Sequence, residues 1–325
     1  NNYFIKEKKW KNGDTLIQKD LANTLKIIRD EKRKGFYDGE ITKKIIESLG
    51  SESLLSLEDF RSYESIWRKP IISKINEYKI ISMPPPSSGG IALSQLIKML
   101  FNFETNNLKH NSAQYIHLLT EIEKLVYADR SKYLGDSDFY KVPIKKLLNE
   151  NYLQNQSKKI DLSKPTPSKS INPGDLNYNE SEETTHFSII DFDGNAVSVT
   201  TTLNTNFGSK VFVDDLGFLL NNEMDDFSSK PGSPNTYGLI GSEANSIAPG
   251  KRMLSSMTPT IIEKENELFL ILGSPGGSTI ITSVFQTFLN LVLFNMDIQS
   301  AVDEPRFHHQ WLPDYIYLEK NSLNP

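Results

Sequence analysis

Thr184 and Thr185 stand where a polar segment gives way to a strand-like one, in the stretch ETTHFSIID at 183–191. A threonine hydroxyl is a weak nucleophile unless a base takes its proton, and the free α-amine of the same threonine can be that base. This amine exists only when the peptide bond between Glu183 and Thr184 is broken. The alternative is a β-branched strand start without chemistry, and these residues alone favour that alternative.

Two acidic residues and two serines could bind a charged ligand. Glu223 and Asp226 lie three positions apart beside two asparagines in LLNNEMDDF at 219–227, and clustered carboxylates can hold an ammonium group. The alternative is a solvated acidic loop, which is the commoner case. Ser255 and Ser256 are adjacent hydroxyls that could bind a carboxylate, although the pair alone is a weak indication.

The sequence GSPGGST at 273–279 connects a strand-like run to a helix-like run. Small residues at such a junction leave backbone N–H groups pointing outward at the positive end of the helix dipole. These N–H groups can form an oxyanion hole or a phosphate nest. A tight strand-to-helix turn needs the same glycines for steric reasons, so both interpretations stay open.

The histidines do not indicate a metal site. His308 and His309 are adjacent, so in an extended segment they point in opposite directions and cannot easily share a metal ion. His110 and His117 lack acidic or thiol ligands at a suitable spacing. We therefore predict neither a metal nor a cofactor.

The composition narrows the class of protein. A net charge of −5 provides no basic field for phosphates, which argues against a nucleic-acid partner. The longest apolar segment, 280–294, is shorter than the roughly 20 residues that span a bilayer. Cysteine is absent, which excludes disulfides but leaves the compartment open. The chain begins at Asn1 without a methionine, so we expect that upstream residues were removed or left out, and the lack of a signal peptide decides nothing.

Hydrophobic periodicity predicts helices first, then a strand-rich half that ends in helices. This order indicates an α+β layered architecture with sheet inside and helices outside. We expect N-caps at Asp14 and Ser112. The expected helices cover 16–28, 42–49, a short helix from 56, 91–101, 112–134 and about sixteen residues after 279. The expected strands cover 78–83, 187–191, 196–203, 258–262 and 267–272.

Residues 154–183 have little periodicity and are rich in Ser, Lys, Pro and Asn. This composition is typical of an exposed, mobile connector. The buried strand that we expect to begin at Thr184 follows it directly. The end of the connector is therefore the place where we expect the chain to be cut.

Several motifs in a fixed order resemble the γ-glutamyltranspeptidase family of N-terminal nucleophile hydrolases. The resemblance runs from about residue 13 to residue 319. In the first half SMPPPSSGG and YADRSKYLGD are similar to the end of that family's large chain, and the motifs of the second half are TTHFS, TTLNTNFG, LLNNEMDDFSSKPG, SSMTPT, GSPGGS and PRFHHQWLPD.

This resemblance implies an αββα sandwich formed by two pieces of one precursor. The family cuts itself in front of a threonine and keeps both pieces in one structural domain. For this sequence the resemblance implies a cut between Glu183 and Thr184. Residues 1–183 are then part of the large chain, and residues 184–325 are the small chain. The resemblance also implies that the large chain continues upstream and there contributes an arginine that pairs with the substrate α-carboxylate; we assign no local arginine to that role.

The resemblance assigns a role to each candidate residue. Thr184 is the nucleophile, and Thr202 hydrogen-bonds its hydroxyl. The other assigned groups bind the substrate: Asn204, Glu223 and Asp226 take the α-ammonium of a γ-glutamyl group, Ser255 and Ser256 its α-carboxylate, and the N–H groups of Gly276 and Gly277 the oxyanion.

The resemblance finally implies γ-glutamyl transfer and hydrolysis, with glutathione as a substrate and an amino acid or peptide as acceptor. Residues 230–245 are similar to the family's lid, with Tyr237 at the gating position, and a lid favours small γ-glutamyl compounds. The alternatives are an acylase or polyglutamate depolymerase of the same family, or a non-catalytic binding scaffold. Bacterial members are mostly exported, which implies a periplasmic or extracellular location.

Overall fold

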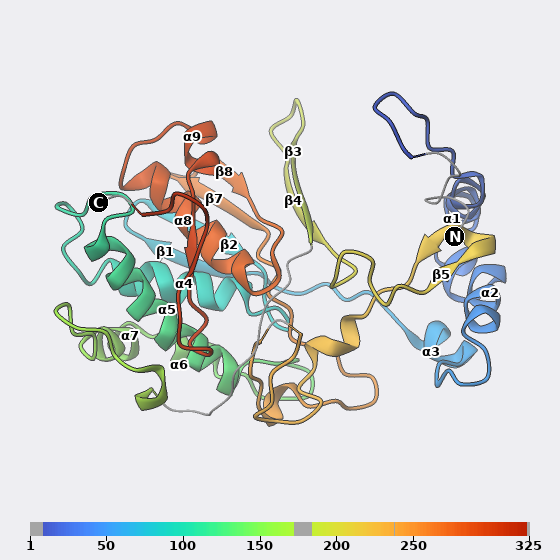
Figure 1. Cartoon of the computed structure of the whole chain (residues 1–325), viewed down its shortest axis with the longest axis horizontal. Coiled ribbons are helices and arrows are strands. Elements are labelled where there is room, and N and C mark those ends of the chain that lie inside the picture. The colour runs from blue at the N-terminus through green and yellow to red at the C-terminus, as the bar shows by residue number, and fades with distance from the viewer. Residues whose placement is uncertain (1–8, 172–183, 237, 324–325) are drawn as a thin grey trace. The chain divides into compact units, whose positions relative to one another are not determined.

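The computed structural model describes residues 9–171, 184–236 and 238–323. The chain divides into two compact units, shown in Figure 1, and each is described by itself. The smaller unit comprises the residues up to Trp67 together with Phe207–Asn222. The larger unit comprises Arg68–Asn206 and the residues from Glu223 onward, and it contains every candidate site residue named above.

The smaller unit is a helical cluster with a short strand pair. Its elements are α1 (Lys19–Tyr37), α2 (Glu40–Leu49), α3 (Leu57–Ser62), β5 (Phe212–Val213) and β6 (Phe218–Leu219). Ile41, Ile45, Val213 and Leu216 form its core.

One expected helix start in this unit is wrong. The first helix begins at Lys19 rather than near Leu16, because the Asp14 carboxylate accepts a hydrogen bond from the backbone N–H of Lys11 and closes a turn instead of capping the helix. The short helix expected from residue 56 is confirmed, with Ser56 and Asp59 forming a capping box.

A four-stranded antiparallel sheet forms the centre of the larger unit. Its strands lie in the order β1 (Ile71–Ile75), β2 (Tyr78–Ser82), β7 (Thr260–Lys264) and β8 (Glu267–Leu272). β1 was not expected from the sequence, although its alternating burial follows the strand period. The β2–β7 pairing places Ile80 opposite Ile262 and joins two distant parts of the chain.

Helices cover one face of this sheet (Figure 1). α4 (Gly89–Leu100) contacts both β1 and β2, and it also packs against α5 (Ala113–Tyr133) and α8 (Ile280–Val292). The side chains of α4 and α8 are almost all buried, and the expected N-cap of α5 is confirmed because the Ser112 hydroxyl accepts from the Tyr115 N–H. The α+β class is therefore confirmed.

The larger unit also contains shorter helices and a short strand pair. These elements are α6 (Ile144–Leu147), α7 (Glu150–Ser157), α9 (Ile298–Asp303), β9 (Phe307–His308) and β10 (Tyr317–Leu318).

β3 (Thr185–Ile190) and β4 (Ala196–Thr201) form the expected hairpin, with Thr185 opposite Thr201. Two serines connect it to β8: the hydroxyl of Ser188 donates to the carbonyl of Ile271 over 3.3 Å, and that of Ser198 to the carbonyl of Leu272 over 3.2 Å. The Ser198 hydroxyl also accepts from the Thr260 N–H of β7 over 3.0 Å. The expectation of a buried strand after Thr184 is wrong. Apolar side chains of the hairpin are exposed, namely Phe187, Ile189, Ile190, Phe192 and Val197.

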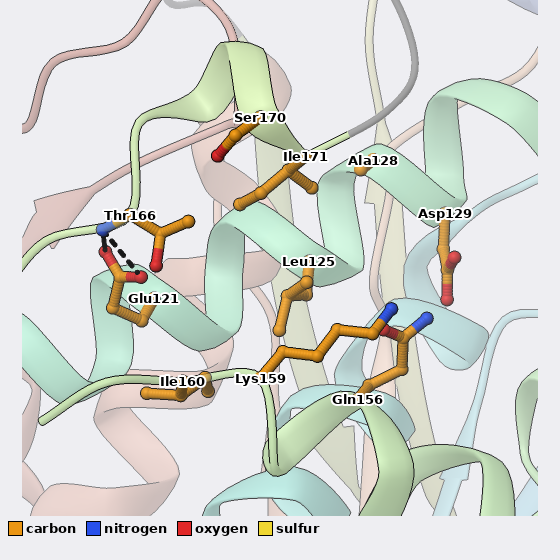
Figure 2. A pocket seen from close by; sticks show the side chains of 10 residues that line it. All are labelled: Glu121, Leu125, Ala128, Asp129, Gln156, Lys159, Ile160, Thr166, Ser170 and Ile171. Atoms are coloured by element: carbon orange, nitrogen blue, oxygen red, sulfur yellow. Dashed lines mark hydrogen bonds between the residues drawn. The ribbon is translucent and has the colours of Figure 1, made fainter.

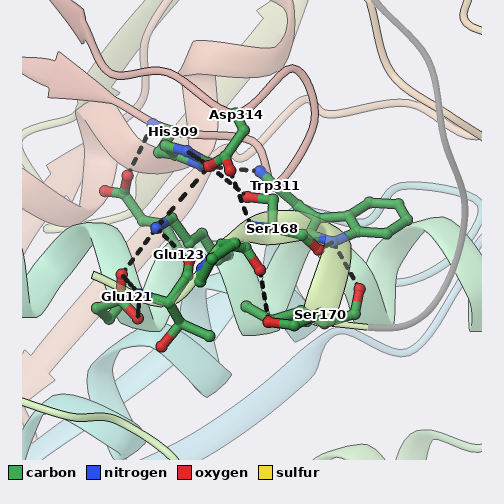
Figure 3. A network of polar contacts seen from close by, with 11 residues as sticks. Glu121, Glu123, Ser168, Ser170, His309, Trp311 and Asp314 are labelled. Carbon is green, nitrogen blue, oxygen red and sulfur yellow. Dashed lines mark hydrogen bonds and ion pairs between the residues drawn. The ribbon is translucent and has the colours of Figure 1, made fainter. Parts of the chain in front are cut away.

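The described part of the connector is largely exposed, as expected, but polar contacts join it to the core. Figure 3 shows Ser168 within a polar network. Its backbone N–H and its hydroxyl donate to the two carboxylate oxygens of Asp314 over 2.9 and 2.7 Å. The indole N–H of Trp311 donates to the carbonyls of Ser168 and Ile171. These polar contacts stabilise the connector as far as Ile171, and residues 172–183 lie outside the described part of the chain.

We expect Phe288→Ala to lower the free energy of unfolding by about 3–5 kcal/mol, because it deletes a buried ring and leaves a cavity. Phe288 is 1% exposed in α8 and stacks edge-on against Tyr78. The matched control is Phe192→Ala at the exposed tip of the hairpin, expected to change stability by less than about 0.5 kcal/mol. Urea unfolding of the two variants and the parent tests this, and equal losses would contradict the described packing.

Candidate active site

A small cavity brings together most of the residues predicted to do chemistry. Its free volume of about 20 Å³ is enough for roughly one water molecule. Its lining residues come from segments that lie up to 96 positions apart, from Thr184 at the start of the hairpin to Ile280 at the start of α8. Of the predicted residues, the lining includes Thr184, Thr202, Asn204, Asp226, Ser255, Ser256 and Gly277.

The hairpin register places Thr184 and Thr202 at the same end of the strand pair. Thr185 pairs with Thr201. Thr184 precedes Thr185 and Thr202 follows Thr201, so these two residues are neighbours across the hairpin. The Thr202 hydroxyl accepts a hydrogen bond of 2.8 Å from the Asn204 N–H, which fixes the turn that follows β4. Asn204 is buried and has a φ of 75°, a conformation that asparagine tolerates better than most residues. The turn therefore points Asn204 inward beside Thr184.

Asp226 is the acidic group of the cavity. Burial, followed by the charge of Glu223, raises the pKa of Asp226 to about 8. Its Oδ1 accepts from Asn235 Nδ2 over 3.3 Å, and its backbone carbonyl accepts from Asn245 Nδ2 over 2.7 Å. Glu223 does not line the cavity, but burial raises its pKa to about 7. Two partly buried carboxyl groups that lose their protons near neutral pH have the chemistry to hold a cation.

The two serines of the SSMT segment are held by the turn that precedes α4. The Ser88 N–H donates to the Ser255 carbonyl over 2.8 Å, and the Ser255 N–H donates to the Pro86 carbonyl over 3.0 Å. Ser256 accepts a hydrogen bond from Arg130 Nη2 over 3.0 Å. Arg130 was not among the predicted site residues. A signal was nevertheless present in the sequence, because Arg130 continues the apolar stripe of α5 one turn beyond Val126.

The two glycines before α8 adopt conformations that other residues avoid. Gly276 has a φ of 125° and Gly277 a φ of 51°. A Cβ atom on Gly276 would lie 2.3 Å from the Thr279 hydroxyl oxygen. A 3₁₀ turn from Gly277 to Thr279 leads directly into α8, so the Gly277 N–H lies at the positive end of the helix dipole. Gly277 lines the cavity, whereas Gly276 does not.

The segment predicted to be a lid reaches the cavity through Leu239, which is one of its lining residues. Asn235 of the same segment contacts Asp226, as described above. Tyr237, the predicted gating residue, lies outside the described residues. Glu183, on the other side of the predicted cut, lies outside them as well.

Two larger cavities lie along α5 and contain none of the predicted site residues. Figure 2 shows the first, of about 350 Å³, where Glu121 accepts from the Thr166 N–H and where Asp129, Gln156 and Lys159 also line the wall. The second has about 590 Å³ and a mostly apolar lining. A further cavity, of about 250 Å³, is lined by Thr184 and Thr202, so the predicted nucleophile borders both this cavity and the small one.

Across residues 9–171, 184–236 and 238–323, no three His, Cys, Asp or Glu side chains are grouped as metal ligands. No described helix combines the length and the apolar character that a membrane span requires. His308 and His309 are both buried, and burial lowers the pKa of His308 to about 4.

The family model described as gamma-glutamyltranspeptidase matches residues 1–324. The chain belongs to the γ-glutamyltranspeptidase family. It is 47% identical over 311 residues to the glutathione hydrolase proenzyme of Escherichia coli, an alignment that covers 95% of this chain and 54% of the relative. It is 45% identical over 313 residues to the protein of the same name from Pseudomonas aeruginosa, covering 95% of this chain and 56% of the relative. The chain thus spans about half the length of these curated relatives.

A solved structure confirms the expected fold. The cephalosporin acylase from Bacillus halodurans superimposes with a TM-score of 0.75 at 23% sequence identity, over 91% of this chain and 51% of that one. At this identity the likeness concerns the fold alone. The chain therefore has the α+β fold of this acylase.

We expect Asp226→Asn to stabilise the ligand-free protein, and more so as the pH rises. The folded pKa of about 8 exceeds the unfolded value of about 3.9, so the folded state binds the extra proton and Asp226 lowers stability progressively between those two pH values. The gain in the free energy of unfolding grows by about 1.4 kcal/mol for each pH unit between these two pKa values. Denaturant unfolding at pH 5 and pH 8 measures it, with the exposed Asp193→Asn as matched control. A gain that is equal at both pH values would contradict a raised pKa.

Proposed function

We propose that this chain transfers and hydrolyses γ-glutamyl groups through a γ-glutamyl ester of Thr184. One observation carries the proposal: Thr184, at the predicted cut, lines the same cavity as a buried carboxyl group, two serine hydroxyls and a glycine at a helix N-terminus. Each of these groups matches one part of a γ-glutamyl amide. The names of the curated relatives, glutathione hydrolase proenzymes, support glutathione as a substrate.

Maturation is the first step of the proposed mechanism. The Thr184 hydroxyl attacks the carbonyl of Glu183, the C–N bond breaks, and the amide becomes an ester while the α-amine of Thr184 takes up the proton. Water then hydrolyses the ester, which releases the Glu183 carboxylate and restores the Thr184 hydroxyl. Residues 1–183 become part of a large chain and residues 184–325 the small chain. The β2–β7 pairing and the contacts of Ser88 with Ser255 connect the two pieces without a covalent bond.

The mature site performs acyl transfer in two steps. The Thr184 amine takes the proton of its own hydroxyl, whose oxygen attacks the γ-carbonyl of the substrate. The N–H groups of Gly276 and Gly277 stabilise the resulting oxyanion. The tetrahedral intermediate expels the amine leaving group, which takes up the proton, and leaves an ester on Thr184. Water then releases glutamate, or the amine of an amino acid or peptide forms a new γ-glutamyl amide.

The remaining groups recognise the glutamyl head group. Asn204, Glu223 and Asp226 bind the α-ammonium. The positive charge of this ammonium favours ionisation of Glu223 and Asp226. Ser255 and Ser256 donate hydrogen bonds to the α-carboxylate, and Thr202 hydrogen-bonds the nucleophile. Tyr237 gates the pocket from the lid segment.

We also propose that the protein acts outside the cytoplasm, in the periplasm or beyond. The basis is the resemblance to a family whose bacterial members are mostly exported. Fractionation of the source cells followed by immunoblotting tests this proposal, and exclusive recovery with cytoplasmic markers would contradict it.

We expect Thr184→Ala to abolish both self-cleavage and release of p-nitroaniline from γ-glutamyl-p-nitroanilide, because it removes the only atom that forms the ester. The intact mass of the incubated parent should resolve into two fragments split between Glu183 and Thr184. The matched control is Thr185→Ala, which deletes the neighbouring hydroxyl and should still be cut.

Either of two results would contradict the proposed function. Thr184→Ala could retain turnover, or the parent could cleave itself and yet act only on a β-lactam side-chain amide or polyglutamate. The second result would instead identify an acylase or depolymerase, one of the alternatives within the family.

A further inference from the structure

Arg130 is a buried cation behind the candidate active site. It lies near the end of α5 and is 3% exposed. Among the described residues its guanidinium forms no ion pair; it donates to two neutral hydroxyls, from Nε to Ser88 Oγ and from Nη2 to Ser256 Oγ, each over 3.0 Å. Buried charges are ordinarily paired, so this position requires an explanation.

The charges that face Arg130 leave its guanidinium only partly compensated. Asp226 is the carboxyl group that acts on it through space, and burial raises the pKa of that group to about 8, so much of it is protonated at neutral pH. Burial also lowers the pKa of Arg130 itself. A cation in such surroundings is stabilised when an anion binds nearby.

The hydrogen bond from Arg130 determines what Ser256 can do. A serine hydroxyl has one proton to donate and lone pairs to accept with. Because Ser256 Oγ already accepts from a cationic donor, its own proton is available to donate toward the cavity that it lines. A hydroxyl polarised in this way is a better donor to a carboxylate.

The second contact of Arg130 fixes the geometry of the first. Ser88 Oγ, which accepts from Nε, donates in turn to the Ser255 carbonyl over 2.8 Å. The planar guanidinium therefore spans from the turn before α4 to the SSMT segment and holds Ser255 and Ser256 in one arrangement. A lysine ammonium on a flexible stem does not reproduce this fork.

We propose that Arg130 is a positioning residue that makes the Ser255–Ser256 end of the cavity selective for a carboxylate, by orienting the Ser256 hydroxyl and by supplying a positive charge behind it. The inference rests on the proposed function and deepens it. Arg130 acts through Ser256 and does not touch the substrate. It differs from the arginine that the family resemblance implies upstream, which pairs with the α-carboxylate directly.

The test compares two substrates that differ only in the α-carboxylate: γ-glutamyl-p-nitroanilide and 4-aminobutyryl-p-nitroanilide. For Arg130→Met we expect the ratio of their kcat/KM values to fall about tenfold or more, mainly through a higher KM for the glutamyl substrate. Arg306→Met, which removes an arginine paired with Glu319 at the surface, should keep the parent ratio. An equal loss on both substrates would show a merely structural role and overturn the inference.

A double-mutant cycle tests whether Arg130 acts through Ser256. Ser256→Ala should lower the same ratio, and adding Arg130→Met to it should lower the ratio much less than in the parent. Arg130→Lys should recover only part of the ratio, since the charge returns without the fork. Full additivity of the two changes would contradict action through Ser256. If Arg130→Met does not fold, Ser88→Ala replaces it in the cycle, with a smaller expected loss because only one anchor of Arg130 is removed.

Calorimetric titration with L-glutamate and with 4-aminobutyrate separates this inference from the proposed function. If the parent binds glutamate but turns over neither anilide, the proposed function fails. The inference then stands or falls on whether Arg130→Met weakens glutamate binding about tenfold while leaving 4-aminobutyrate binding unchanged. If the parent turns over the glutamyl anilide and Arg130→Met keeps its preference, the inference alone fails. A parent that binds no glutamate overturns both.

Discussion

The backbone contact between the turn at 86–88 and Ser255 is the constraint on which the site depends. Two backbone hydrogen bonds join these segments, and the approach is so close that a Cβ atom on Gly89 would lie 2.5 Å from the Met257 carbonyl oxygen. Only glycine fits there. Because α4 begins at this glycine and β7 follows the SSMT segment, the contact fixes the helical layer relative to the sheet. It also fixes Ser255 and Ser256 at the wall of the cavity.

Three charged groups in and around the cavity oppose folding in the absence of a ligand. Asp226 and Glu223 are buried carboxyl groups with raised pKa values, and Arg130 is a buried cation without an ion pair among the described residues. Each carries a desolvation cost that a hydrophobic residue of similar size would avoid. Such groups are typical of sites that bind charged ligands. The surrounding apolar core of α4, α5 and α8 offsets this cost.

Local signals predicted most elements, whereas relations between distant segments were accessible only through the structure. The Ser112 cap, the β3–β4 hairpin and the α8 start follow from neighbouring residues. β1 was missed because IISKI is short and follows a segment without clear periodicity. The family resemblance identified most of the residues that meet at the cavity, but Arg130 went unnoticed because its role comes from Ser88 and Ser256, 42 and 126 positions away. The exposed face of β3 was also unpredictable, since a β-branched run indicates a strand but not its neighbours.

The β2–β7 pairing has a consequence for the time at which the protein can mature. Ile80 pairs with Ile262, so the central sheet cannot close until the residues around 262 have left the ribosome. Contacts of such long sequence separation form late and slowly. Thr184 is synthesised well before the serines and glycines that surround it in the folded chain. A nascent chain therefore lacks the groups that line the cavity with Thr184, and the order of synthesis itself delays the proposed self-cleavage until the fold is complete.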